Sequence, residues 1–465
     1  MKKLILPSLV AIALAVTSCD DKLDIIPKGE TTLNTIADLE LLLNQEYALG
    51  DGPLSDIGMV CNDGFPAWTD MSELLASSQT LQYAYVKWDE SIDRATLTTS
   101  DSRYNSLYEA IYYCNVIISK APEADGSDAL RDLIIAEAKV KRAYFHYLLV
   151  NIYAKQYDES TAAQLGGVPY VDIVNMEVTK EKNSIAEVYD RILDDCSEDI
   201  INVLPDNAAV NRADKAFGNA VRAKVLMQMK RYNEAATYAR EALRYNNNLD
   251  NRSNIVTTEA WELPWDSRNN YLHIGGGARV SITFTCMSKE LAKLFSPDDY
   301  VRKYEIGWNG LPTWEDSEVE YGYPEGLIYT SFSDVMFNNY GIRTEDMYYI
   351  LAETDIREGR VDDGLNYVDQ VQLRRIDGYT PLKGSGLSIA QAMQKMQEAK
   401  KVEFFCTYVN FFDCKRWNTE TDYRSTITRD LGKYGSFTIT PDSPLWVMPF
   451  PANATRYNPT LTQNY

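Results

Sequence analysis

Aromatic side chains gather in two stretches of the sequence that lack a helical pattern, and polar or charged residues accompany them. An aromatic ring offers an apolar face on which the C–H faces of a sugar ring can pack, while nearby polar side chains pair with hydroxyl groups. Two or three such rings at a surface therefore suit a hydroxyl-rich ligand. The first stretch supplies Asp63, Trp68, Tyr85, Trp88 and Asp89, and the second supplies Trp265, Asp266, Arg268, Asn270, Tyr271, Trp308, Asn309 and Trp314.

Eight of these residues are the candidate ligand contacts. Each ring that a ligand covers contributes on the order of 1.5–3 kcal/mol. Some loop aromatics pack beneath their own loops instead, and tyrosines within helical stretches are expected to belong to the core. We expect Trp88 and Trp308 to lie in the site, with Trp265 and Trp314 next, followed by Tyr271, Trp68, Tyr85 and Asp63.

The sequence shows no arrangement typical of catalysis or metal binding. Its 67 Asp and Glu residues produce many carboxylate pairs by chance. Asp298-Asp299 is typical of a turn and Asp362-Asp363 of a helix start, and Gly275-Gly276-Gly277 lacks the strand-to-helix setting of a phosphate loop. His146 lies in the middle of a helical stretch, where a core or edge role is expected. We therefore predict no enzyme activity, no catalytic residues, no metal and no cofactor.

Composition limits the partners and the size of the core. The net charge of −21 supplies no basic stripe to neutralise phosphates, so nucleic acid is not an expected partner. With 465 residues, 45% of them hydrophobic, the chain has ample material for a large core.

The N-terminus is typical of a bacterial lipoprotein. Met1-Lys2-Lys3 is followed by an apolar run from Leu4 to Val16, too short to span a bilayer comfortably, and the run ends in Val16-Thr17-Ser18-Cys19. Small residues before a cysteine predict cleavage before Cys19 and lipidation of that residue, which anchors a protein without a membrane span. We assign residues 1–18 to the signal peptide and 19–36 to the lipidated cysteine and a tether. Asp20-Asp21-Lys22 favours the outer face of the outer membrane.

The six remaining cysteines have wide and irregular spacing, with no CxxC pattern. Buried thiols used as small hydrophobic residues are the expected interpretation, and a disulfide is left open. The cysteines are Cys61, Cys114, Cys196, Cys286, Cys406 and Cys414.

Apolar residues at three-and-four spacing predict helices that come in pairs. The longest begins at Ala129 and ends before Gly166-Gly167-Val168-Pro169, and Ser184 with Glu187 is a capping box that opens a helix to Leu204. Helix, tight turn and helix with small residues where helices cross predict a mainly α, tetratricopeptide-like fold. Within a single domain over 37–465 we expect helix pairs at about 105–155, 184–245, 343–376 and 387–406, a short helix at 38–47, loop-rich regions with short strands at 51–101 and 246–340, and extended chain from Pro441.

These features together resemble the SusD/RagB family of outer-membrane nutrient-binding lipoproteins. No piece is specific alone, but their order and spacing cover essentially the whole chain. The matching pieces are the Cys19 lipobox, Leu43 to Tyr47, Tyr108 to Asn115, Glu137-Ala138-Lys139, Arg142-Ala143-Tyr144, Gly167-Val168-Pro169, Arg343 to Tyr348, Ala352-Glu353, Lys415-Arg416-Trp417, Met448-Pro449-Phe450-Pro451, Asn458-Pro459 and Gln463-Asn464.

The resemblance implies a SusD-like scaffold of helix pairs and an irregular half that carries the ligand site. It also implies a lipid-anchored protein at the cell surface that captures glycan for nutrient uptake by a SusC-like, TonB-dependent transporter. Two alternatives stay open: the same scaffold binding peptides, and a tetratricopeptide module that binds proteins. Aromatic residues clustered in loops rather than on helix faces favour glycan over the protein-binding module.

Overall fold

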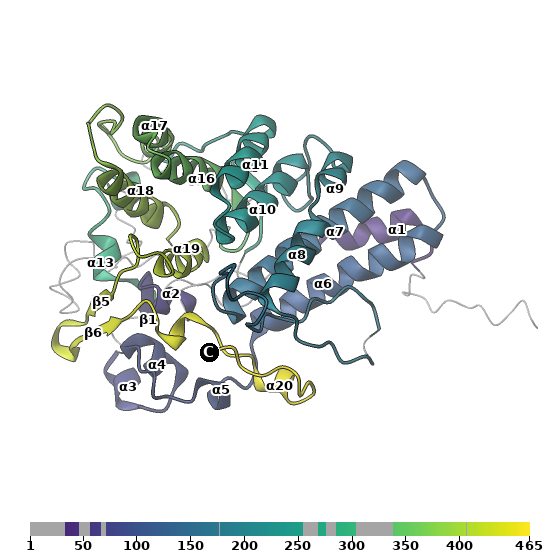
Figure 1. Cartoon of the computed structure of the whole chain (residues 1–465), viewed down its shortest axis with the longest axis horizontal. Coiled ribbons are helices and arrows are strands. Elements are labelled where there is room, and N and C mark those ends of the chain that lie inside the picture. The colour runs from purple at the N-terminus through teal and green to yellow at the C-terminus, as the bar shows by residue number, and fades with distance from the viewer. Residues whose placement is uncertain are drawn as a thin grey trace, which may run out of the picture.

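Helices dominate the computed structural model, which describes residues 33–45, 56–66, 71–175, 177–253, 268–275, 285–303, 338–405 and 407–465 (Figure 1). The long predicted helix is α7 (Asp128–Tyr153), and it pairs with α6 (Ser102–Lys120). Two further pairs follow, α10 (Lys215–Gln228) with α11 (Tyr232–Tyr245), and α16 (Thr344–Arg357) with α17 (Val361–Gln372). The predicted mainly α fold with tetratricopeptide-like helix pairs is confirmed.

Neighbouring pairs cover one another, as expected of a repeat array. α8 (Ile185–Asp195) packs on α7, α11 packs on α16, and α18 (Ile389–Glu403) packs on α16 and α17. Figure 1 shows this array running from α6 and α7 at one end to α17 and α18 at the other. The other helices are α1 (Ile36–Leu41), α2 (Ile57–Val60), α3 (Met71–Ala76), α4 (Leu81–Lys87), α5 (Arg94–Leu97), α9 (Glu198–Val203), α13 (Lys289–Ala292), α14 (Tyr300–Lys303), α19 (Val409–Asn418), α20 (Ala452–Thr455) and the 3₁₀ turns η1 (Leu42–Asn44), η3 (Ala121–Glu123), η5 (Gly432–Tyr434) and η6 (Pro444–Trp446).

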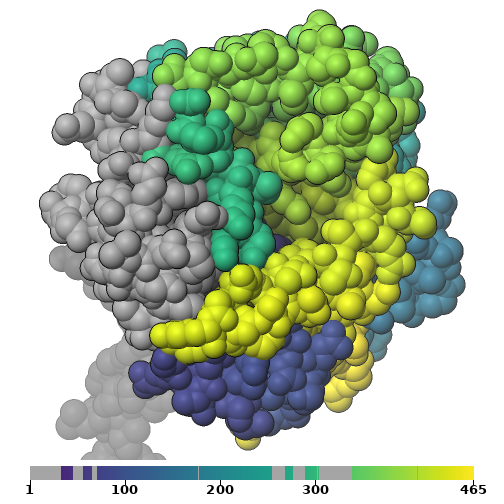
Figure 2. Space-filling model, turned by 90° about the vertical axis from the view of Figure 1, so that its left-hand side faces the viewer, coloured from purple at the N-terminus to yellow at the C-terminus, as the bar shows by residue number. Residues whose placement is uncertain are grey.

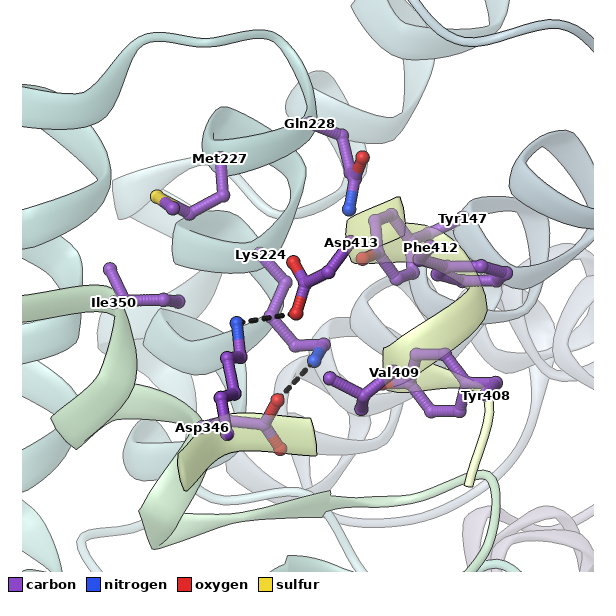
Figure 3. A pocket seen from close by; sticks show the side chains of 11 residues that line it. Tyr147, Lys224, Met227, Gln228, Asp346, Ile350, Tyr408, Val409, Phe412 and Asp413 are labelled. Atoms are coloured by element: carbon purple, nitrogen blue, oxygen red, sulfur yellow. Dashed lines mark hydrogen bonds and ion pairs between the residues drawn. The ribbon is translucent and has the colours of Figure 1, made fainter. Parts of the chain in front are cut away.

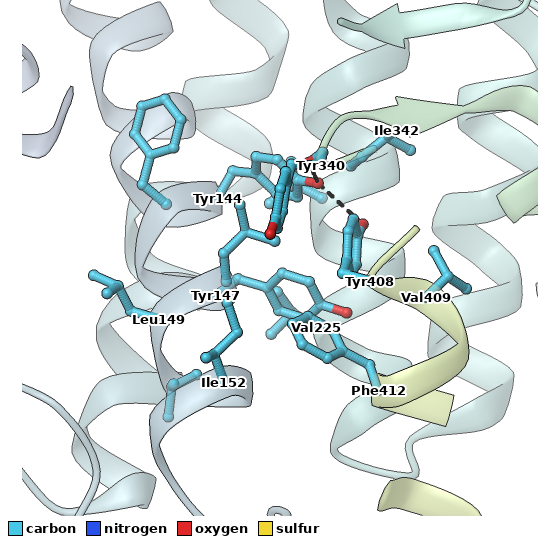
Figure 4. Packing of buried hydrophobic residues seen from close by; sticks show 14 of the residues in the cluster. Tyr144, Tyr147, Leu149, Ile152, Val225, Tyr340, Ile342, Tyr408, Val409 and Phe412 are labelled. Atoms are coloured by element: carbon cyan, nitrogen blue, oxygen red, sulfur yellow. Dashed lines mark hydrogen bonds between the residues drawn. The ribbon is translucent and has the colours of Figure 1, made fainter. Parts of the chain in front are cut away.

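The core is rich in aromatic rings where α7 meets α19. Tyr144 and Tyr147 on α7 face Tyr408 and Phe412, and all four rings are buried (Figure 4). The Tyr144 hydroxyl donates to the Tyr340 carbonyl at 2.5 Å and lies 3.0 Å from the Tyr408 hydroxyl. Burial of each ring stabilises the fold by roughly 1.5–3 kcal/mol, and the paired hydroxyls avoid the cost of buried unpaired oxygen.

Small residues let the helices of a pair approach closely. Gly364 on α17 faces α16, where an added Cβ atom would lie 2.7 Å from the Ala352 carbonyl oxygen and 2.6 Å from Ile356 Cγ1. A side chain at this position would therefore push the two helices apart.

The predicted helix from Ser184 to Leu204 is wrong in its length. The capping box at Ser184 and Glu187 is present, but the chain leaves the helical conformation at Cys196 and forms a second helix, α9. Ser197 has the extended conformation of an N-cap, and acidic residues follow in the first turn of α9. These residues favour the start of a new helix over continuation of α8.

The first loop-rich region differs from its prediction. Short helices α2 to α5 occupy much of residues 51–101, and several begin at side-chain caps, such as Thr80 accepting the Tyr83 N–H at 3.1 Å and Asp93 accepting the Thr96 N–H at 3.2 Å. Toward the C-terminus the predicted helix 387–406 is α18, and α19 follows it as a separate helix that carries Lys415-Arg416-Trp417.

The chain after Pro441 lies across the helices, as predicted. The Met448 N–H donates to the Ile152 carbonyl at 3.0 Å, at the end of α7, and the Ala452 N–H donates to the Thr98 carbonyl at 2.8 Å, just after α5. This segment therefore connects the short N-terminal helices to the helix array.

Among the described residues the strands form three antiparallel pairs. β1 (Gly64–Pro66) pairs with β3 (Thr285–Met287), β2 (Asn270–Leu272) with β4 (Ile342–Arg343), and β5 (Ile427–Asp430) with β6 (Ser436–Ile439). The β2 and β4 pairing holds the second loop-rich region against the start of α16.

Candidate ligand site

The two loop-rich regions meet through the pairing of β1 with β3. Gly64 lies opposite Met287, and Pro66 lies opposite Thr285, more than two hundred positions later in the chain. This pairing brings described parts of the two loop-rich regions side by side. A two-stranded ladder of this length has little stability of its own, so its surroundings must hold it.

A polar frame beside β1 fixes this junction. The Asp63 carbonyl accepts the Ser288 N–H at 2.9 Å, and the Asn410 side chain donates to the Asp63 carboxyl oxygens at 2.9 and 3.2 Å. The Asn62 side chain donates to Glu290 on α13 at 3.0 Å. Burial raises the pKa of the Asp63 carboxyl to about 7, although the hydrogen bond from Asn410 and the positive charge of Lys401 lower it. Asp63 is thus a buried structural carboxyl in the described structure.

The β5–β6 hairpin completes the frame from the C-terminal side. Figure 2 shows residues 285–303 beside this hairpin, with the short N-terminal helices on its other side. Lys289 Nζ lies 3.1 Å from an Asp430 carboxyl oxygen, and the Asp430 N–H donates to Glu290 at 3.1 Å. Segments near residues 60, 290 and 430 therefore share one polar junction.

Trp88 lies inside this frame. The Trp88 Nε1–H donates to the Met59 carbonyl at 3.1 Å, and the Arg429 guanidinium lies 4.1 Å from the centre of the Trp88 ring. Arg429 also donates to the Val86 carbonyl at 2.7 Å and to the Asn62 side chain at 2.8 Å. The Trp88 ring thus packs against a buried cation, the Arg429 guanidinium.

Several of the predicted ligand contacts have buried side chains that a ligand cannot reach. Exposed fractions are 5% for Trp88, 4% for Tyr85, 2% for Tyr271 and 3% for Asp63. The Tyr271 hydroxyl donates to the Asn246 carbonyl at 2.7 Å. Burial raises the pKa of Tyr85 and of Tyr271. In this structure these side chains are buried, and they do not form an accessible stacking platform.

The other predicted contacts are the tryptophans Trp68, Trp265, Trp308 and Trp314, and they lie outside the described residues, as do Asp266, Asn309 and the lipidation residue Cys19. Of the polar neighbours, Arg268 is exposed, whereas Asn270 is buried and accepts a hydrogen bond from Asn338 at 2.8 Å. In the sequence these tryptophans lie close to the described segments 56–66, 268–275 and 285–303.

A charged cavity in the helix array has no room for a ligand. Lys224 and Asp346 form one ion pair on its wall, and Lys400 and Asp413 form another at 2.6 Å (Figure 3). Its volume of about 20 Å³ accommodates roughly one water molecule. The opposed charges neutralise one another, so this cluster is structural.

His146 is a core residue. Its Nε2 accepts the Val171 N–H at 3.0 Å, its Nδ1 lies 2.9 Å from the Arg142 carbonyl, and its ring stacks on Tyr170 with centroids 3.8 Å apart. Burial lowers the pKa of His146 to about 3, so the ring is neutral near pH 7. In the part of the chain that the structure describes, His, Cys, Asp and Glu form no group of three able to hold a metal ion.

Comparison with known proteins identifies the family to which this fold belongs. A family model described as "Starch-binding associating with outer membrane" matches residues 28–227, and a model described as "SusD family" matches residues 328–465. The chain belongs to the SusD/RagB family. The comparison with curated protein sequences gave no significant match.

Solved structures of SusD proteins share the fold. A SusD superfamily protein from Bacteroides thetaiotaomicron VPI-5482 is 16% identical, with a TM-score of 0.72, covering 93% of this chain and 100% of its own. A putative sugar binding protein from Bacteroides vulgatus ATCC 8482 is 17% identical, with a TM-score of 0.70, covering 94% and 99%. A SusD-like carbohydrate binding protein from Bacteroides fragilis NCTC 9343 is 15% identical, with a TM-score of 0.64, covering 93% and 100%. At these identities the likeness establishes the fold alone.

Several residues behind the SusD resemblance have structural roles here. Glu353 on α16 accepts bonds from both Nη atoms of Arg416, at 2.7 and 2.8 Å, and from the Trp417 indole at 3.1 Å. Glu403 accepts from Arg343 at 3.0 Å and from Arg375 at 2.8 Å. Buried charges of this kind must stay paired, because removing one partner leaves the other charge buried and unpaired. These SusD positions therefore preserve the scaffold.

Two SusD-fold residues that hold the ligand region were missed by the sequence analysis. Arg429 and Asn410 reach their partners across hundreds of residues, and neither stands in a stretch with a recognisable pattern. The only local signal was the run of β-branched residues Thr426-Ile427-Thr428 directly before Arg429, which favours a strand.

The predicted buried thiols are confirmed at the cysteines whose side chains are described. Cys61, Cys114, Cys196 and Cys414 are free and buried. Burial raises the pKa of Cys114 and Cys196 to about 12, so both remain protonated thiols near neutral pH.

Proposed function

We propose that this chain is a cell-surface lipoprotein that binds glycan and transfers it to a TonB-dependent, SusC-like transporter in the outer membrane. The proposal rests on membership of the SusD/RagB family and on the match to a family model described as starch-binding and associated with the outer membrane. Among the described helices, none combines the length and apolar character needed to cross a bilayer.

The observation that carries the proposal is the β1–β3 pairing. It joins two regions that are far apart in sequence, and each of them contributes tryptophan and polar side chains. A glycan needs apolar faces and hydroxyl partners together, and the pairing supports the proposal because the sequences of both joined regions carry such residues. We propose binding without bond cleavage.

Within this site the tryptophans outside the described residues become the leading candidates. Trp308 stays the first choice, followed by Trp265, Trp314 and Trp68, because Trp88, Tyr85 and Tyr271 have buried rings. Two or three covered rings, less the cost of ordering the ligand, give a dissociation constant of roughly millimolar to tens of micromolar.

A glycan array on the mature protein identifies the ligand, and calorimetry on single Trp→Ala variants tests the site. Trp308→Ala should weaken binding about tenfold or more, and the variants at Trp265, Trp314 and Trp68 should each weaken it measurably. Tyr457→Ala is the matched control, since Tyr457 follows α20 and its side chain is 75% exposed. If all four tryptophan variants stay folded and bind like wild type, the aromatic site is refuted.

The transfer step has its own test. A tagged chain isolated from native outer membranes should bring a TonB-dependent transporter with it, and a strain lacking that transporter should bind the glycan at its surface without importing it. A protein that binds peptides from a peptide library and no glycan on the array would overturn the glycan assignment while leaving the fold assignment unchanged.

A further inference from the structure

Three half-buried aromatic rings gather where the β5–β6 hairpin packs beside α3 and α4. Tyr83 comes from α4, Tyr434 from the turn η5 and Phe437 from β6, and each ring keeps part of its surface open to solvent. The Tyr434 and Ser72 hydroxyls form a hydrogen bond, which fixes the turn of the hairpin on α3. The rings are therefore held in place by contacts between separate elements.

Two lysine side chains lie against these rings. The Lys87 Nζ atom is 4.9 Å from the centre of the Tyr83 ring and 5.1 Å from the centre of the Phe437 ring, and it donates to the Tyr83 hydroxyl at 3.1 Å. Lys433 is exposed in the hairpin turn, with its Nζ atom 5.0 Å from the centre of the Tyr434 ring. Together, Tyr83, Lys87, Lys433, Tyr434 and Phe437 form what we call the hairpin surface.

Neither lysine of the hairpin surface has a carboxylate partner among the described residues. Cations near the base of the hairpin are paired, since Lys289 Nζ lies 3.1 Å from Asp430 and Arg424 lies 2.6 Å from Asp442. Lys87 is held instead by a neutral hydroxyl and two rings, which orient its ammonium group without neutralising the charge. Of the three N–H donors of this group, the Tyr83 hydroxyl uses one.

The positive charge of the hairpin surface favours an anionic ligand. The whole chain has a net charge of −21, so long-range forces repel an anion and a local cation is needed to bind one. Charges act over roughly 8 Å at physiological ionic strength, so the two lysines act on a group that contacts this surface. A carboxylate or sulfate group accepts hydrogen bonds from ammonium groups, and the neighbouring rings offer apolar faces for C–H groups.

The base of the hairpin connects this surface to the β1–β3 junction. The Asp430 N–H donates to Glu290 on α13 at 3.1 Å, and α13 begins two residues after the end of β3. Figure 2 shows the hairpin between residues 285–303 and the short N-terminal helices. This continuity favours a segment of a polymeric ligand over an isolated small anion.

We propose that the hairpin surface binds an acidic unit of the glycan, whose carboxylate or sulfate group accepts hydrogen bonds from Lys87 and Lys433 while its sugar ring packs on Tyr434 or Phe437. The inference rests on the proposed function and deepens it, because it names acidic glycans as the ligand class. Uronic acids supply the carboxylate and sulfated sugars supply the sulfate, and the test separates these two sources.

The test measures binding to the mature protein by calorimetry at about 50 and 300 mM NaCl. Oligogalacturonate and alginate oligosaccharides are the carboxylate probes, carrageenan and fucoidan oligosaccharides are the sulfate probes, and malto-, xylo- and manno-oligosaccharides are the neutral probes. At least one acidic probe should bind more tightly than every neutral probe. Raising the salt concentration should weaken the binding of that acidic probe several-fold and leave any neutral binding unchanged.

Variants of the two lysines test the assigned contacts. Lys87→Gln and Lys433→Gln should each weaken binding of the acidic probe roughly two- to fivefold, and the double variant should lose most of the salt dependence. Lys87→Arg should retain binding, because it keeps the charge. Lys120→Gln is the matched control, since Lys120 is exposed at the end of α6 and belongs neither to the hairpin nor to α3 and α4. Thermal melts check that each variant is folded, and Lys433→Gln changes an exposed residue that the fold does not need.

The inference is overturned if neutral probes bind as tightly as the acidic ones and independently of salt, or if folded Lys87→Gln and Lys433→Gln variants both bind like wild type. The proposed function survives either result as long as a glycan binds and Trp308→Ala weakens that binding. An acidic peptide that binds in place of every glycan, with the same loss in Lys87→Gln, would assign the hairpin surface to a protein partner and overturn the inference. Binding of no glycan at all would refute the proposed function and the inference together.

Discussion

The Asp63 carboxyl lies in the interior, where it accepts hydrogen bonds from the side-chain amide of Asn410. Its pKa is raised from 3.8 to about 7, so the folded protein holds this proton between about pH 4 and pH 7 while the unfolded chain releases it. Stability from this group is therefore present at low pH and is lost as the pH rises toward 7.

Asp63→Asn should remove this dependence. The variant should match wild type near pH 4 and exceed it above pH 7 by up to a few kcal/mol on the scale of 1.36 kcal/mol per pKa unit. Urea melts at pH 4, 5.5, 7 and 8 measure the difference, with the exposed Asp132→Asn as control. A constant difference across these four pH values would show that Asp63 is ionised in the fold throughout.

Residue types and spacing identified candidate aromatic residues but not the role of each ring. Trp88, Tyr85 and Tyr271 carry the same local signal as any loop aromatic, and their burial depends on remote partners such as Arg429. Because that partner lies 341 positions after Trp88 in the sequence, no local pattern reports the contact. The exposed or buried state of a loop ring is a tertiary property.

At the scale of elements, periodicity predicted the long helices but not every break between them. The ends of α7, α10, α11, α16 and α17 fall close to their predicted positions, because each helix has an apolar face and a clear stop. The predicted helix at 184–204 was wrong because the apolar spacing continues across Cys196, while the chain breaks and restarts at a local N-cap.

Leu351 tests the register of α16. It is fully enclosed in the core, so Leu351→Asp should bury a charge and abolish cooperative folding or lower stability by more than about 4 kcal/mol. Leu373→Asp is the matched control, since Leu373 is 52% exposed and the same change there should cost less than about 1 kcal/mol. Thermal melts compare the two, and equal transitions would mean that α16 is rotated from its assigned register.

Gly364 tests how closely α16 and α17 approach. Gly364→Ala gains up to about 1 kcal/mol in helix propensity but places Cβ against the α16 backbone, so a net loss of roughly 1–3 kcal/mol is expected. Gly218→Ala is the comparison, because its Cβ atom would meet only side-chain atoms of Ile201 and Leu204 at 3.0–3.3 Å, which can move. Denaturant titration should rank Gly364→Ala as the more damaging change; the reverse order would refute the close approach.

For the whole molecule, attachment is predicted to depend on a single residue. Cys19→Ala should release the mature protein from membranes, because acyl chains contribute about 0.8 kcal/mol per buried CH₂ and are the proposed anchor. Fractionation in a strain that lacks the partner transporter gives the result, with Ser18→Ala, which keeps a small residue before the cysteine, as control. Cys19→Ala protein that still sediments wholly with membranes contradicts the lipoprotein assignment.

The polar frame also sets an order of assembly. Asp63 meets Asn410, and Asn62 meets Arg429, so the closing contacts join segments that are synthesised hundreds of residues apart. Loop closure over such separations is slow, whereas neighbouring helices dock through local contacts. The helix array can therefore form while the C-terminal part is still emerging, and the polar frame becomes complete only when α19 and the β5–β6 hairpin have arrived. A chain whose synthesis stops after α18 would be folded over much of its length and would still lack this frame.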